Sequence, residues 1–306
     1  IKILITGGAG FFPGSLAAKL VENPNYFVVL VDNFMTGKKR NIPKAKNVRF
    51  IKCDVNDYLD LAPVMTSHGF DYVFHYAALV GVKRTLANPS MVLEDLQGIK
   101  NVLTLSKNTG VKRIFYSSSS EVYGEPVHLP QHEETTPLNS RLPYAIVKNA
   151  GEAFCKAYKQ EFGLDYTIFR FFNTYGPLQS TDFVMSKFVR AAQRNEKITV
   201  YGKGDQTRTF CYIDDNIETT LKCLEENQYV NDVINIGNDK QITILELAKL
   251  IIKTTKSKSK IEYLPPLPEG DMSRRQPDIA KMKKLLDRDL LPLEKGLKVL
   301  LEKGLF

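Results

Sequence analysis

The chain has 306 residues, 43% hydrophobic residues and a formal net charge of +8, which suits one large core or one and a half domains. No apolar stretch approaches the ~20 residues of a membrane-spanning helix, and no basic-then-apolar signal segment is present. The four cysteines lack metal or redox spacing, and basic residues do not interleave with aromatic ones. We therefore expect a cytoplasmic protein with no metal, no membrane association and no nucleic-acid partner.

The chain begins with a pattern of strand, glycine turn and helix. Residues 1–6 (IKILIT) are a short apolar run, typical of a buried parallel strand. Gly7, Gly10 and Gly14 follow, and SLAAKLVE then repeats its apolar residues at helical spacing. Such glycines let the backbone approach a pyrophosphate at the helix N-terminus. The pattern predicts a dinucleotide site.

An acidic residue ends the second predicted strand. This strand covers residues 27–31, and Asp32 follows it, twenty-two residues after Gly10. A carboxylate at this position can bind both ribose hydroxyls of NAD and would repel a 2′-phosphate. Lys38, Lys39 and Arg40 favour NADP, but they lie six or more residues beyond the acid and are interpreted as solvated surface. The predicted cofactor is NAD.

Strands and helices continue to alternate through the first half of the chain. The further predicted strands are 48–52, 71–77, 113–117 and 166–171, and the helices between them include 91–109 and 144–162. This alternation is typical of an α/β fold with a Rossmann-type, doubly wound parallel sheet. After Asn173 the predicted elements are shorter: a helix at 183–194, strands at 198–201 and 233–236, and a helix at 244–255. We expect an NAD-binding domain at 1–172 and a smaller, mainly substrate-binding α/β domain at 173–306, with some segments returning to the large domain.

A serine cluster and a Tyr-x-x-x-Lys pair follow the strand at 113–117. Ser119 is the third serine after Tyr116, and Tyr144 and Lys148 occur in LPYAIVK. Residues four apart lie on one face of a helix, so the lysine charge is placed to favour the tyrosine phenolate. With 14 tyrosines in the chain, roughly one such pair is expected by chance, so the pair is informative only in this context.

Taken in order, these motifs resemble the extended short-chain dehydrogenase/reductase superfamily, specifically its nucleotide-sugar epimerases, dehydratases and decarboxylases. The matching segments are GGAGF, VDNFMTG, CDVND, HYAA, SSSSEVYG, YAIVK, RFFNTYGP and TVYGKGDQTRTFCYIDD. They run along nearly the whole chain. The resemblance implies an NAD site built from Gly7, Gly10, Phe11, Gly14, Asp32, Asn33, Asp54, Val55, Ala77, Ala78, Tyr144 and Lys148.

The resemblance also implies the catalytic roles. Ser119 would bind the sugar oxygen, Tyr144 would be the general base while hydride leaves C4, and Lys148 would anchor the nicotinamide ribose. Asn173 and Arg208 correspond to residues that contact the substrate diphosphate. Arg275, with Arg274, is a weaker candidate for the same phosphates, or belongs to a solvated basic pair. The implied substrate is a nucleotide-diphosphate sugar, most commonly a UDP-sugar.

Glu121 divides the possible reactions. The 4,6-dehydratases carry Asp-Glu after the catalytic residue, but Ser120 occupies the aspartate position here. UDP-glucuronate decarboxylases carry Ser-Glu and an R-x-P-D segment similar to residues 275–278, whereas AALVGVKRTLANP is closer to the epimerases. We expect a 4-epimerase in which Glu121 adjoins the reacting sugar. Decarboxylase and dehydratase activities remain alternatives, as does a non-catalytic NAD-sensing regulator, a class that commonly loses the tyrosine or lysine.

The sequence departs from the family pattern at two positions, and the resemblance also implies a homodimer. The glycine turn is one residue longer than the usual GGAGF(I/L)GS, which could shift the helix away from the pyrophosphate, and Asp95 lies where an asparagine is usual. Similar enzymes form homodimers through a four-helix bundle. The helices at 91–109 and 144–162 would supply it, with a seam that includes Val92, Leu96, Leu103, Ala153 and Ala157.

Overall fold

The chain divides into two compact units. The first comprises residues 1–122, 140–170 and 220–234, and the second comprises residues 123–139, 171–219 and 235–306. The structure, a computed structural model, describes residues 1–266 and 274–303. The division is not a single cut near residue 172, because one segment from each half of the chain is grouped with the other unit.

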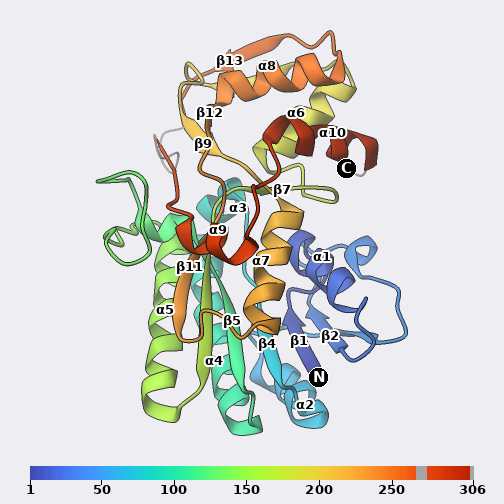
Figure 1. Ribbon diagram of the computed structural model, residues 1–306, viewed down its shortest axis with the longest axis vertical. Helices are drawn as coiled ribbons and strands as arrows, with labels where there is room; N and C mark the ends of the chain where they lie inside the picture. The colour runs from blue at the N-terminus through green and yellow to red at the C-terminus, as the bar shows by residue number, and fades with distance from the viewer. Residues whose placement is uncertain (267–273, 304–306) are drawn as a thin grey trace. The chain divides into compact units, whose positions relative to one another are not determined.

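A seven-stranded sheet forms the centre of the first unit (Figure 1), in the order β11-β6-β5-β4-β1-β2-β3. The strands are β1 (Lys2–Thr6), β2 (Phe27–Asp32), β3 (Val48–Lys52), β4 (Tyr72–His75), β5 (Arg113–Ser119), β6 (Asp165–Phe171) and β11 (Asp232–Ile236). β1 pairs in parallel with both β2 and β4, so that Thr6 lies opposite Val31 and His75. The predicted Rossmann-type α/β fold is confirmed, and the strand expected at 233–236 extends this sheet beside β6.

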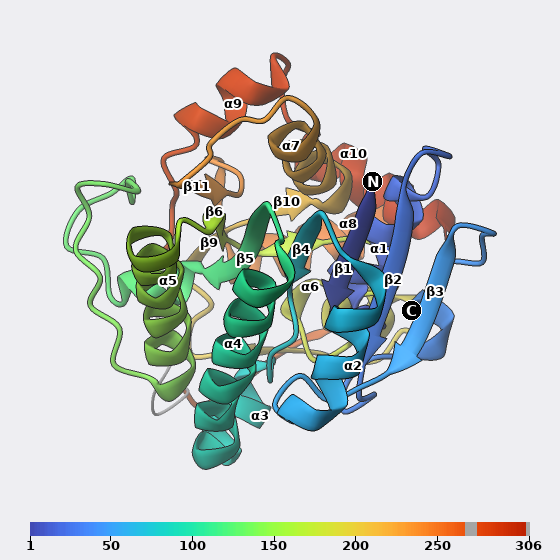
Figure 2. The same ribbon diagram turned by 90° about the horizontal axis from the view of Figure 1, so that it is seen from below.

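Helices cover both faces of this sheet (Figure 2). The helices α2 (Tyr58–His68), α4 (Pro89–Thr109) and α5 (Pro143–Phe162) lie side by side on one face, and α1 (Phe11–Leu20) lies on the other. The short helix α3 (Val82–Ala87) follows β4. Because the central strands are buried on both faces, their sequences are continuous apolar runs without alternation.

The core of the first unit includes two of the residues expected at a dimer seam. Val92 is fully buried and Leu103 is 2% exposed, and both belong to the cluster that packs α4 onto the sheet. Leu96 packs partly against the same cluster. The prediction that Val92 and Leu103 form a seam is therefore wrong, because the helix repeat alone cannot distinguish a face turned to the chain's own sheet from one turned to a second subunit.

The second unit contains short strands in pairs. β7 (Thr174–Tyr175) pairs with β10 (Cys211–Tyr212), and β8 (Ile198–Tyr201) pairs with β13 (Ile261–Leu264), both in parallel. β9 (Thr207–Thr209) and β12 (Gln241–Thr243) are antiparallel. The helices assigned mainly to this unit are α6 (Val184–Gln193), α7 (Ile213–Glu225), α8 (Ile244–Thr255), α9 (Ala280–Leu286) and α10 (Leu293–Lys303). The C-terminal part of α7, from Thr220, belongs to the first unit.

Two further observations bear on composition. Within residues 1–266 and 274–303, no helix is long and apolar enough to cross a membrane.

The four cysteines are buried free thiols: Cys53, Cys155, Cys211 and Cys223. Burial raises the pKa of Cys53 and Cys223 to about 12. These thiols are therefore protonated and unreactive at neutral pH.

Candidate active site

The glycine turn brings backbone amide groups to the carboxyl end of β1. Gly7 has a φ of +68°, and a Cβ placed on it would lie 2.9 Å from the backbone nitrogen of Ala77, so a side chain is excluded by strain and by space. The Gly10 amide donates to the Gly7 carbonyl at 2.8 Å, and α1 begins at the next residue. This cradle of small residues at a helix N-terminus fits a dinucleotide pyrophosphate.

The extra residue of the turn is absorbed inside the first turn of α1. Pro13 is buried there, in a position that needs no amide donor. Gly14 follows, and a Cβ on Gly14 would overlap the carbonyl of Asn41. Asn41 in turn donates from Nδ2 to the Ala9 carbonyl at 2.9 Å. The third glycine thus lets α1 approach the segment after β2, while the helix still begins directly after Gly10.

A buried hydroxyl joins the ends of β1 and β4. Thr6 Oγ1 accepts from the amides of Tyr76 and Ala77 at 3.1 and 3.0 Å and lies 2.8 Å from His75 Nδ1. Burial lowers the pKa of His75 to about 3, so the ring is neutral. This bond network fixes the backbone at Ala77 and Ala78, where the sequence predicts cofactor contacts.

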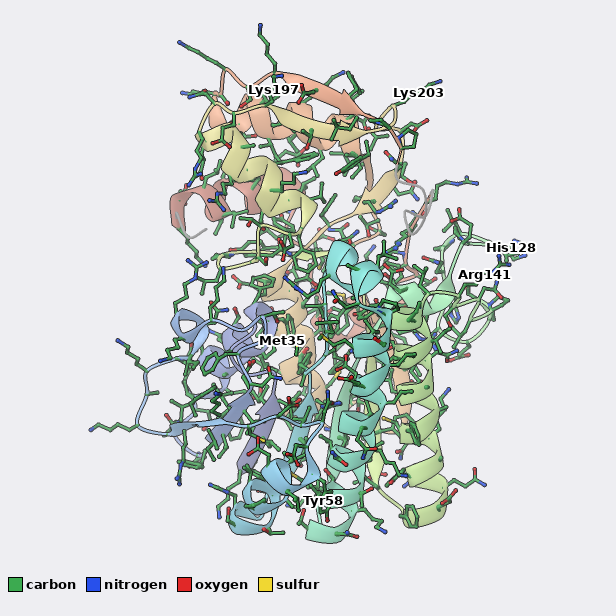
Figure 3. The ribbon with its side chains drawn as sticks, turned by 180° about the vertical axis from the view of Figure 1, so that it is seen from behind. Met35, Tyr58, His128, Arg141, Lys197 and Lys203 are labelled. Atoms are coloured by element: carbon green, nitrogen blue, oxygen red, sulfur yellow. The ribbon has the colours of Figure 1, made fainter. Side chains whose placement is uncertain are left out.

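Asp32 ends β2 with its carboxylate directed back to the glycine turn. It accepts from the amide of Ala9 at 3.1 Å and from that of Phe34 at 2.7 Å, and burial raises its pKa. Asn33 donates to Asp54 at 3.0 Å. A hollow of about 650 Å³ adjoins these residues and is lined by Asn33, Met35, Lys52, Cys53, Asp54 and Asp60, with Met35 marked in Figure 3. Polar acceptors beside an open hollow fit the adenosine half of a dinucleotide.

The Tyr-x-x-x-Lys pair lies on the first two turns of α5, with Pro143 as the first helical residue. Lys148 is 3% exposed, its Nζ donates to the Ser117 carbonyl at 2.7 Å, and it lies 5.8 Å from the centre of the Tyr144 ring. Burial lowers the pKa of Lys148 to about 8, and the charge of Asp95 opposes that shift. The ammonium is therefore mostly protonated at neutral pH and lies within electrostatic reach of the phenol.

Ser119 is the last residue of β5. It is 9% exposed, and its Oγ accepts from the amide of Glu121 at 3.2 Å. Glu121 lies in the short 3-10 helix Ser120–Tyr123 and is partly buried. Lys148 therefore binds β5 at Ser117, two residues before the predicted catalytic residue Ser119. The first unit brings both side chains to the end of this strand.

The predicted diphosphate contacts lie in the second unit. Asn173 donates to the Thr209 carbonyl at 3.2 Å, and neighbouring Arg208 is 7% exposed with Nη1 bonded to the Thr207 carbonyl at 2.7 Å. Asn173 and Arg208 are therefore brought together around β9. Arg275 is 7% exposed whereas Arg274 is exposed, so the two arginines do not form a solvated pair.

The sequence singles out Asp95 as a departure from the usual asparagine but indicates no role for it. Its Oδ2 accepts from the Leu79 amide at 2.7 Å, burial raises its pKa, and the charge of Lys148 opposes that rise. The carboxylate therefore caps the backbone after β4 and adds negative potential beside the lysine. Thr6 and the Ser117 carbonyl were missed, because a backbone acceptor and a core threonine leave no motif.

Comparison with known proteins decides the family. Residues 3–237 match the NAD dependent epimerase/dehydratase family. The chain belongs to this family. Among curated relatives, UDP-glucuronic acid decarboxylase 1 of Danio rerio is 36% identical over 97% of the chain and 71% of its own length. A putative UDP-glucose 4-epimerase of Methanocaldococcus jannaschii is 34% identical over 97% of the chain and 96% of its own length.

Solved structures of this epimerase/dehydratase family share the fold. UDP-glucose 4-epimerase of Thermotoga maritima superposes with a TM-score of 0.93 at 32% identity, covering 99% of this chain and 98% of that one. UDP-glucuronic acid 4-epimerase of Bacillus cereus, solved with UDP-glucuronic acid and NAD, gives 0.90 at 29% identity and covers both chains in full. The protein is thus an enzyme of an NAD-dependent nucleotide-sugar family, and NAD is its cofactor.

The buried lysine makes stability depend on pH. The pKa of Lys148 is about 8 in the folded state against an ordinary 10.5, so between these values the unfolded state binds the extra proton. Stability should therefore rise with pH from 8 to 10.5, by about 3 kcal/mol in total, in the cofactor-free protein relative to Lys148→Met. Urea midpoints across this range measure the slope. Lys156→Met, at an exposed site on the same helix, is the control and should leave the slope unchanged.

Asp32 should set the preference for NAD. Asp32→Ala removes the ribose acceptor and the repulsion of a 2′-phosphate, so NAD affinity should fall about tenfold or more while NADP affinity changes less. Asp32→Asn, which keeps one acceptor and loses the charge, should fall between. Titration calorimetry with both cofactors measures the gap. Tighter binding of NADP than NAD by the unsubstituted protein would contradict the assignment.

Proposed function

We propose that the protein is a nucleotide-sugar 4-epimerase that acts on a UDP-sugar by transient oxidation at C4. The observation that carries the proposal is the set of Ser119, Tyr144 and Lys148 at the end of β5 and the start of α5. The agreement with the Thermotoga maritima 4-epimerase over nearly all of both chains supports the choice within the family.

In this proposal each side chain acts on one atom of the sugar. Ser119 donates to the C4 oxygen and orients it, and Tyr144 removes the hydroxyl proton. Lys148 holds the ribose hydroxyls and, with its positive charge, favours the phenolate. Bound NAD would accept the C4 hydride and give it back, and Tyr144 would return the proton to the C4 oxygen in the second transfer. The 4-keto sugar turns between the two transfers, so the hydride reaches the opposite face and the C4 configuration inverts.

In the second unit, Asn173 and Arg208 are proposed to bind the substrate diphosphate. The guanidinium of Arg208 is mostly withdrawn from solvent and is held by a backbone carbonyl, which reduces the entropy lost when it binds phosphate oxygens. Arg275, which is 7% exposed, is proposed as a weaker candidate for the same group on the strength of the family resemblance.

A second candidate function is decarboxylation of a UDP-glucuronate. Glu121 favours it, because the Ser120-Glu121 pair matches the decarboxylases and several curated relatives carry that name. Both reactions begin with oxidation at C4, so they share Ser119, Tyr144 and Lys148. They differ afterwards, since only decarboxylation requires a proton to be delivered to C5.

We also propose a homodimer through α4 and α5. Exposed apolar residues remain on these helices, including Leu93 (45% exposed), Ile146 (44%) and Phe162 (47%). Together with exposed Ala153 they could form a four-helix seam in place of the buried Val92 and Leu103. Sedimentation should give about twice the 34.6 kDa chain mass at micromolar concentration. Leu93→Glu together with Ile146→Glu should give the monomer, and a monomer before substitution would contradict the proposal.

Tyr144→Phe should retain the fold and NAD binding but lose turnover by roughly a hundredfold or more, because the general base is removed. Ser119→Ala should cost less, since water can replace an orienting hydrogen bond. Turnover of UDP-sugars by both variants, together with NAD titration as a control for folding, measures the effects. Near-normal activity in Tyr144→Phe would rule out this base.

Glu121→Gln and heavy water together distinguish the two reactions. A 4-epimerase transfers the same hydride out and back, so turnover of Glu121→Gln should stay within about tenfold, and product formed in D₂O should carry no deuterium on carbon. Mass spectrometry and NMR of the product measure both. Deuterium at C5 together with a collapse of activity in Glu121→Gln would instead contradict the epimerase. Loss of carbon dioxide would then identify the decarboxylase, and loss of water would identify a dehydratase.

A further inference from the structure

Three buried polar side chains connect α5, β5 and β6 beneath the proposed catalytic residues. Glu152 Oε1 accepts from Ser118 Oγ at 2.5 Å and from Arg170 Nε at 2.9 Å, and Oε2 accepts from Arg170 Nη2 at 2.6 Å. The Glu152 and Arg170 side chains are each 2% exposed. A two-pronged bond between a guanidinium and a carboxylate fixes both distance and angle, unlike apolar contact.

The same stretch of β5 holds α5 at a second point and ends in the catalytic serine. The Ser117 carbonyl accepts a hydrogen bond from the Lys148 ammonium, and the Ser118 hydroxyl donates one to Glu152. Ser119 is the next residue of the strand. Lys148 and Glu152 are four residues apart, so they lie on one face of the helix about 6 Å apart along its axis. Two consecutive residues of the strand therefore bind two successive turns of the helix.

Apolar packing alone would leave this helix free to slide. Gly151 lies between the two contacts, and a Cβ there would overlap the hydroxyl of fully buried Tyr116. The absent side chain brings α5 close to β5, where the Tyr116 hydroxyl donates a long hydrogen bond of 3.5 Å to the Lys148 carbonyl. The Glu152 carboxylate adds a much shorter bond to Ser118, and Arg170 of β6 prevents this carboxylate from turning. Burying the Glu152–Arg170 ion pair costs desolvation free energy that offsets the attraction between the two charges. Stabilisation of the fold is therefore not a sufficient reason for the pair to be there.

We propose that Glu152, held by Arg170, is a positioning residue that binds Ser118 and thereby keeps Tyr144 and Lys148 in register with Ser119. The inference rests on the proposed C4 oxidation for its kinetic consequences but not for the geometry. A misplacement of the reacting groups by about 1 Å can cost on the order of a hundredfold in rate. Loss of the register should therefore lower kcat while binding of substrate and cofactor changes little.

Ser118→Ala tests the register with the least disturbance, because the ion pair remains. We expect kcat to fall about tenfold or more, with KM and NAD affinity within about twofold. Ser118→Thr, which keeps the hydroxyl, should restore turnover. Ser106→Ala is the matched control: Ser106 is fully buried on α4, and its hydroxyl has no hydrogen-bond partner among the described residues. Equal kcat in Ser118→Ala and the unsubstituted enzyme would overturn the proposal.

A second pair of variants separates register from folding. Glu152→Gln leaves Arg170 buried without its counter-ion and is expected to unfold, whereas Glu152→Leu with Arg170→Met removes both charges and the acceptor for Ser118 and should fold. The double variant should bind NAD and remain slow. Normal turnover in the folded double variant would show that the pair has no positioning role.

The titration of Lys148 provides a readout that does not depend on the reaction. In the cofactor-free protein, NMR of the lysine side chain should give a pKa near 8, and the double variant should move it toward 10.5 as the helix loosens and water enters. An unchanged titration would count against the positioning role of Glu152 even if no nucleotide sugar reacts. Conversely, a shifted titration with no turnover of any UDP-sugar would support the positioning role and refute the proposed function.

Discussion

The parallel pairing of β1 with β2 and β4 is the constraint on which the site depends. Thr6 lies opposite Val31 and His75, so three strands end at one edge of the sheet. Because of that register, the glycine turn, the Asp32 carboxylate and the backbone after β4 lie around one point. A one-residue slip would separate the Thr6 hydroxyl from the two amides that it accepts, and Gly7 would lose the close approach to Ala77 that makes a side chain impossible there.

Around this edge the first unit buries charges that are unfavourable taken singly. Lys148 and Asp95 are both largely removed from water, and each favours the charged form of the other. Glu152, one turn farther along α5, forms a bonded pair with Arg170 of β6. For Lys148 and Asp95, desolvation opposes each charge and the opposite charge partly offsets it, so small displacements of these two side chains change their protonation. Such sensitivity is typical of catalytic sites.

The relatives explain why the reaction is harder to assign than the family. UDP-sugar epimerases and UDP-glucuronic acid decarboxylases match this chain at similar identity, and both of the reactions proposed above begin with oxidation at C4. What distinguishes them is the fate of the 4-keto sugar, which depends on a single acid near C5 and on room for the sugar to turn. Glu121 is the only one of the proposed site residues whose role differs between the two reactions.

Local sequence determined the dinucleotide turn, Asp32 and the Tyr-x-x-x-Lys pair, because each depends on spacing within one strand, turn or helix. It also determined most strands of the sheet, whose apolar runs are long and continuous. Only the tertiary structure decided that β11 returns to the sheet, that Val92 and Leu103 face the core, and that Arg275 is buried while Arg274 is exposed. Nor could any spacing reveal that Lys148 binds the Ser117 carbonyl or that Glu152 joins Ser118 to Arg170. These contacts join residues 18 to 34 positions apart, and they are set by how helix and strands pack, which a pattern along the chain does not record.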